Sequence, residues 1–197
     1  MLFYQKWRGI YNMLQTNKDK LPADKKLSAA RTQLIIRKAF VFYGSLVMRL
    51  PLKPDIMCNR AYTDGLVIGY NPEFIDTLTF DETLFLLAHE ACHVAHLHQI
   101  RFKKGIHEHD LFNQAADYSI NDILINAGFV MPGCGLHDAK YTGKTVEEIY
   151  KLLDQQSDDE KQARKQGGNF GEVRPLPKKN QQGQSIDRQQ CSPHAWG

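Results

Sequence analysis

The chain of 197 residues is long enough for one domain of ordinary size plus a tail. Its 42% apolar residues suffice for a hydrophobic core, and its net charge of +3 is too small to indicate nucleic acid or an anionic membrane as partner. The N-terminus lacks the layout of a secretory signal, and the longest apolar run, residues 39–48, is too short to cross a bilayer. We therefore expect a cytoplasmic protein with four reduced cysteines, and its oligomeric state stays open.

The first half of the chain predicts two helices followed by a small sheet. Apolar periodicity indicates helices over residues 4–16 and 27–50, and the two prolines that follow end the second one. Residues 56–62 and 66–70 are rich in strand-forming residues, and Asp64-Gly65 between them is a hairpin signal. These features predict a small antiparallel hairpin.

The second half predicts three more helices and a tail. The first covers residues 81–98 with Thr79 or Asp81 as N-cap, the second covers 110–127, and the third begins at Thr145. From residue 154 onward polar residues, glycine and proline dominate, and such a segment buries too little surface to offset its ordering entropy. We expect a mostly helical α+β domain over residues 1–154 and a disordered or linker-like tail over 155–197.

The run His89-Glu90-Ala91-Cys92-His93 lies inside the helix predicted over residues 81–98 and has the form H-E-x-x-H. Residues four apart share one face of a helix, so both imidazoles can reach one ion. Glu90 points about 100° away from His89. Its carboxylate is then placed to act as a general base on a water molecule at the metal.

A catalytic zinc ion takes three protein ligands, so a third one is needed. His96 lies about 10 Å from His89 along a straight helix, and His98 points to the opposite side, where we expect a structural hydrogen bond. On the next helix Asn113, Asp117 and Asn121 form one polar stripe. A buried carboxylate needs a partner, which makes Asp117 the predicted third ligand. The alternative is that Asp117 caps or pairs with a neighbour, and the two asparagines lie behind the ligands or beside the substrate.

Residues 86–98, 115–121 and 141–150 resemble a family of bacterial and phage metallopeptidase-domain proteins. The likeness covers roughly residues 25–155 and implies a zincin-like fold, with helices around a small sheet whose edge strand lies beside the metal. By that analogy the strand Leu66–Tyr70 would hold an extended peptide by strand addition. Longer members end in a von Willebrand factor A-like domain. Nothing after Leu153 resembles that domain, and residues 171–174 look like the linker that precedes it.

Together these features predict a zinc-dependent peptidase acting on peptides or proteins, with no nucleic-acid or membrane partner. Zn²⁺ is held by His89, His93 and Asp117, and Glu90 is the general base. Four residues remain open as donors to the developing oxyanion: Tyr62, Tyr70, Tyr118 and His137. The alternative function is a metal-binding interaction module without turnover, since binding alone would use the same three ligands.

Overall fold

The computed structural model describes residues 16–37, 40–104, 107–156 and 174. The fold is α+β and mostly helical, as predicted. The helix predicted over residues 4–16 lies outside the described residues apart from its last residue, and so does the tail beyond residue 156 apart from Arg174. The elements in chain order are α2 (Ala23–Ile36), α3 (Val41–Arg49), β1 (Leu52–Pro54), β2 (Ala61–Thr63), β3 (Ile68–Tyr70), α4 (Pro72–Thr77), α5 (Phe80–Ala95), α6 (His98–Arg101), α7 (His109–Asn126), the 3₁₀ turn η2 (Ala139–Tyr141) and α8 (Val146–Asp154).

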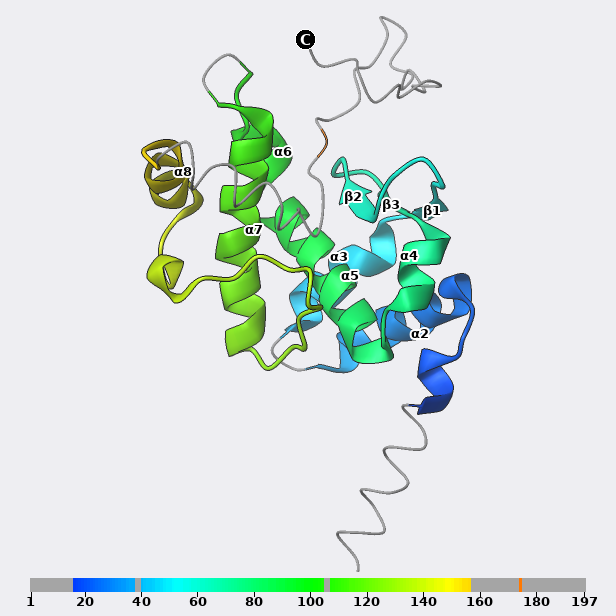
Figure 1. The fold of residues 1–197 in the computed structure, drawn as a ribbon. Coiled ribbons are helices and arrows are strands. Elements are labelled where there is room, and N and C mark those ends of the chain that lie inside the picture. The colour runs from blue at the N-terminus through cyan, green and yellow to red at the C-terminus, as the bar shows by residue number, and fades with distance from the viewer. Residues whose placement is uncertain (1–15, 38–39, 105–106, 157–173, 175–197) are drawn as a thin grey trace, which may run out of the picture.

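Helix α5 is the centre of the fold (Figure 1). Helices α2 and α3 pack on it from one side and α7 from another, while α8 packs on the far side of α7. Apolar side chains of α2, α3, α5 and the sheet form the larger core, and those of α7 and α8 form a second one. Helix α7 therefore has one face against α5 and another against α8. The described residues include no helix long and apolar enough to span a membrane.

The single helix predicted over residues 27–50 is wrong, because the chain forms two helices there. Helix α2 ends at Ile36, and α3 begins at Val41 and packs back against it. The close approach occurs at Gly44, where an added Cβ would lie 3.0 Å from the backbone nitrogen of Ile35. Breaking the helix lets both halves bury apolar residues against α5, which one straight helix could not do.

The sheet has three strands in the order β1-β3-β2. The predicted hairpin is present, since β2 pairs antiparallel with β3 and aligns Tyr62 with Gly69. The sheet is mixed rather than wholly antiparallel, because β1 adds a parallel strand on the other side of β3. Strand β3 is therefore central, so the expectation that Leu66–Tyr70 is an edge strand is wrong. Strand β2 is an edge strand, and it packs against α5.

Helix α5 begins and ends with clear local signals. Thr79 is the N-cap: its hydroxyl accepts from the Glu82 N–H at 3.3 Å, and the Glu82 carboxylate accepts from the Thr79 N–H at 2.8 Å. The helix ends at Ala95, three residues earlier than predicted. Leu97 has φ 56°, in the left-handed region, and this turn separates α5 from α6. His98 is thereby carried onto a new helix.

Candidate metal centre

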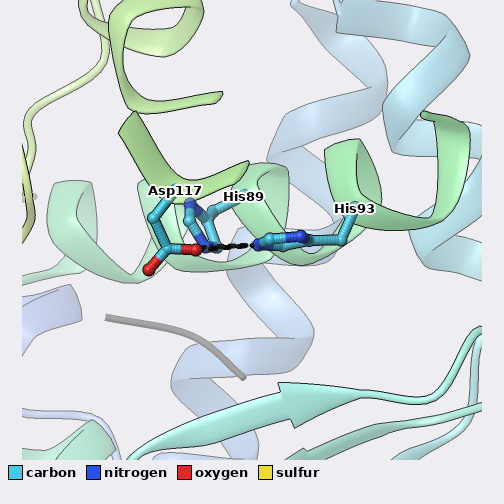
Figure 2. A group of neighbouring side chains, drawn as sticks. All are labelled: His89, His93 and Asp117. Atoms are coloured by element: carbon cyan, nitrogen blue, oxygen red, sulfur yellow. Dashed lines mark hydrogen bonds and ion pairs between the residues drawn. The ribbon is translucent and has the colours of Figure 1, made fainter. Parts of the chain in front are cut away.

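The predicted metal ligands meet at the contact between α5 and α7 (Figure 2). His89 and His93 lie one turn apart on α5, and their Nε2 atoms are 2.8 Å apart. Asp117 Oδ1, on α7, is 3.4 Å from His89 Nε2 and 3.2 Å from His93 Nε2. All three side chains are fully buried, and one ligand atom from each lies within 4.8 Å of the others. His96 and His98 do not belong to this group of described residues.

These spacings fit a single metal ion. Ligand atoms about 2.0–2.1 Å from a tetrahedral zinc lie about 3.3 Å from one another, close to the distances between His93, His89 and Asp117. Apart from the imidazoles of His89 and His93, no described residue offers a hydrogen bond to the buried Asp117 carboxylate. A buried anion in that state is costly unless a positive charge lies beside it. Two imidazole nitrogens and one carboxylate oxygen are a donor set that zinc accepts.

Asn121 orients His89 from behind. Its side-chain N–H₂ donates to the Leu136 carbonyl at 2.8 Å, which leaves its oxygen facing His89 Nδ1 at 2.9 Å. Because that oxygen can only accept, the Nδ1 of His89 is the donor. In the neutral ring the proton therefore sits on Nδ1, and Nε2 keeps the lone pair that a metal needs.

His98 has the corresponding position behind His93. The two Nδ1 atoms lie 3.0 Å apart, so the structural hydrogen bond expected of His98 is present. The left-handed turn at Leu97 brings it there, rather than the straight helix that was predicted. Burial, together with the neighbouring histidines, lowers the pKa of His98 well below its usual range, so the ring is neutral. A neutral His98 can accept at Nδ1, and in that arrangement the proton of His93 lies on Nδ1 and its Nε2 is open to a metal.

The charges in this group also favour a cation. Burial lowers the pKa of His93 to about 4, with the neighbouring His89 lowering it further, so His93 is neutral near pH 7. Burial raises the pKa of Asp117, but the two histidines lower it more, and the carboxyl stays ionised. Burial lowers the pKa of His89, but the charge and hydrogen bonding of Asp117, with the charge of Glu90 and the hydrogen bond to Asn121, together raise it. The group therefore holds a buried negative charge that is balanced by whatever positive charge His89 or an ion supplies.

Glu90 is also fully buried on α5, next to the first ligand. Its charge contributes to the raised pKa of His89, which places the carboxylate within electrostatic reach of the site. This position suits a proton acceptor beside the metal, and not a fourth ligand, since Glu90 is outside the group of converging ligand atoms.

The other predicted residues have contacts elsewhere. Asn113 is buried on α7, one turn before Asp117. His96 caps the end of α5, and its ring lies edge-on to Tyr43. The four residues considered as oxyanion donors contact other partners: Tyr62 stacks on Arg174, Tyr70 lies in the larger core, Tyr118 packs on Tyr141, and His137 is 3.6 Å from Asp122. The structure does not single out an oxyanion donor among them.

Sequence reasoning missed two parts of this centre. The Leu136 carbonyl orients Asn121, but a backbone carbonyl leaves no residue-type signal. The turn at Leu97 orients His98, but neither glycine nor asparagine marks it. Both features depend on tertiary packing.

A sequence model of the family described as putative metallopeptidase domain matches residues 22–194. The chain belongs to this family. The resemblance inferred from the motif residues is therefore confirmed, and the match includes all of α5 and α7. No curated protein and no solved structure matches this member of the family. The family description thus agrees with the group of converging metal ligands.

Proposed function

We propose that the protein is a zinc-dependent peptidase that hydrolyses peptide bonds in peptides or proteins. The observation that carries the proposal is the convergence of His89, His93 and Asp117 from two helices beside the buried Glu90. Zinc is preferred because two imidazoles and one carboxylate, completed by water as a fourth ligand, are typical of catalytic zinc. We place the activity in the cytoplasm, with no nucleic-acid or membrane partner.

Each residue of the site has a role in this proposal. Zinc bound by the three ligands would polarise the scissile carbonyl and lower the pKa of water from 15.7 toward about 7. Glu90 takes a proton from the attacking water and passes it to the leaving amine. Asn121 fixes the tautomer of His89, and His98 holds the ring of His93 through the contact between their Nδ1 atoms. Burial keeps competing solvent away and strengthens each charge interaction.

The test is hydrolysis of casein and of a peptide library by the full-length chain loaded with zinc. The wild-type chain should cleave, and a chelator should abolish cleavage. Glu90→Gln should retain zinc but lose about 10²–10⁴-fold in rate, because only the proton acceptor is removed. Glu73→Gln, an exposed glutamate on α4, is the matched control and should cleave like wild type.

Two results would contradict the proposal. If Glu90→Gln cleaves as fast as wild type, Glu90 is not the general base. If the zinc-loaded wild-type chain cleaves no substrate, the site binds metal without turnover and the chain is an interaction module.

A further inference from the structure

The ring of Tyr62, on the edge strand β2, lies over Gly69 of the neighbouring strand β3. Gly69 is its cross-strand partner on β3, and a Cβ added there would lie 2.2 Å from the Cε1 and Cζ atoms of the ring. The missing side chain at Gly69 is therefore what lets the ring cover the neighbouring strand. One face of Tyr62 rests on the sheet.

The guanidinium of Arg174 covers Tyr62, with its central carbon 3.4 Å from the ring centroid. Its Nη1 lies 3.8 Å from Oδ2 of Asp55, and both side chains are about three-quarters buried, with exposed fractions of 23% and 26%. Stacking on an aromatic face and pairing with a carboxylate are the two interactions that favour arginine over lysine. Burial raises the pKa of Tyr62 to about 12, so the ring stays neutral and its face remains attractive to a cation.

The backbone of Arg174 also joins the sheet. Its N–H donates to the carbonyl of Thr63, the last residue of β2, at 2.8 Å. The next residue in the chain is Pro175, and a residue before proline favours extended backbone. Arg174 is therefore held at the edge strand by a main-chain hydrogen bond to Thr63 and by the contact of its guanidinium with Tyr62. This is the pattern of peptide recognition by strand addition.

We propose that Asp55, Tyr62 and the outer edge of β2 form a binding site for an arginine on an extended peptide segment. Arg174 of this chain occupies the site in cis. Strand β2 packs against α5, the helix with His89, Glu90 and His93, so this site and the candidate metal centre adjoin the same helix. It follows that arginine-bearing peptides are the preferred substrates and must displace Arg174. This consequence rests on the proposed function.

The test measures binding without turnover. A fluorescently labelled peptide with the sequence of residues 170–178 is added to the full-length, zinc-loaded Glu90→Gln chain, with and without Arg174→Ala, and its anisotropy is recorded. The Arg174→Ala chain should bind the peptide about tenfold more tightly than the chain that retains Arg174, because the cis competitor is gone. Arg164→Ala, another arginine C-terminal to α8, is the matched control and should leave peptide binding unchanged.

Three changes distinguish binding at the Asp55 and Tyr62 site from non-specific binding of the peptide. A peptide with alanine in place of its arginine should bind about tenfold more weakly, and this arm needs no change in the protein. Tyr62→Leu should weaken binding by a similar factor. Gly69→Ala should also weaken it, because the new Cβ displaces the ring without removing it.

The proposed arginine-binding site would be refuted if the arginine and alanine peptides bound equally well. It would also be refuted if the labelled peptide did not bind the Arg174→Ala chain. If the peptide bound equally well to the chains with and without Arg174, Arg174 would not occupy the site in cis. An absence of hydrolysis by the zinc-loaded wild-type chain, with peptide binding to the Glu90→Gln chain intact, would contradict only the proposed function. The two proposals therefore fail separately.

Discussion

The Nδ1 of His89 lies 2.9 Å from the side-chain oxygen of Asn121, and both residues are fully buried. Asn121→Ala removes the group that fixes the proton on Nδ1. We expect the affinity for zinc to fall about 10–100-fold, the usual cost of losing a hydrogen bond behind a metal-ligating histidine. Competition with a chromophoric zinc chelator measures it.

The control for that experiment is Asn126→Ala, at the exposed end of the same helix, which should keep the wild-type affinity. Unchanged zinc affinity in Asn121→Ala would mean that Asn121 does not orient His89 for a metal.

The turn between α5 and α6 predicts a stabilising substitution. Leu97 has φ 56° and is 53% exposed, so it has a strained backbone and a side chain that contributes little burial. Leu97→Gly should raise the free energy of unfolding by about 0.5–1 kcal/mol, since relief of the left-handed strain exceeds the entropy cost of glycine. Urea unfolding measures it.

Leu66→Gly is the matched control, because Leu66 is 49% exposed and is not among the described non-glycine residues with positive φ. It should destabilise the protein. Equal destabilisation by both substitutions would show that the turn at Leu97 carries no strain.

A third prediction concerns acid stability at the contact between α6 and α8. Arg101 Nη2 lies 2.6 Å from Glu147, and its hydrogen bond to that carboxylate lowers the pKa of Glu147 below its usual 4.5. A lowered pKa in the folded state means that the pair stabilises the fold above pH 4.5, and that this contribution is lost as the pH falls through the lowered value. With exposed fractions of 34% and 49%, the pair contributes about 0.2–1 kcal/mol.

Urea unfolding of wild type and Glu147→Gln at several pH values tests this. The wild type should be more stable at pH 7, and the difference should vanish below the lowered pKa of Glu147. A difference that stays constant down to pH 3 would contradict the assignment to this ion pair.

The candidate site was predictable because its signals are local or periodic. H-E-x-x-H places His89 and His93 on one helical face whatever the surrounding fold, and the polar spacing on α7 left Asp117 as the carboxylate facing inward. The capping boxes at Thr79 and Thr145 are equally local and are both present. Residue types at fixed spacing were enough for these features.

The remaining features depend on contacts between distant segments. The break between α2 and α3 reflects the close packing at Gly44, and β1 is a strand because of its parallel pairing with β3. The place of Arg174 on Tyr62 joins residues more than a hundred positions apart, and its sequence surroundings look like a linker. Local propensity carries no information about such contacts.

The most direct test of the account is the metal content of the purified full-length chain, measured by elemental analysis after dialysis against trace zinc. Wild type should hold one zinc ion per chain, and Asp117→Ala should lose it while keeping its helical circular dichroism. Asp122→Ala, the next acidic residue on α7 and outside the converging group, should retain the ion. A folded Asp117→Ala chain that keeps a full equivalent of zinc, or a wild-type chain that holds none, would contradict the assignment of His89, His93 and Asp117 as metal ligands.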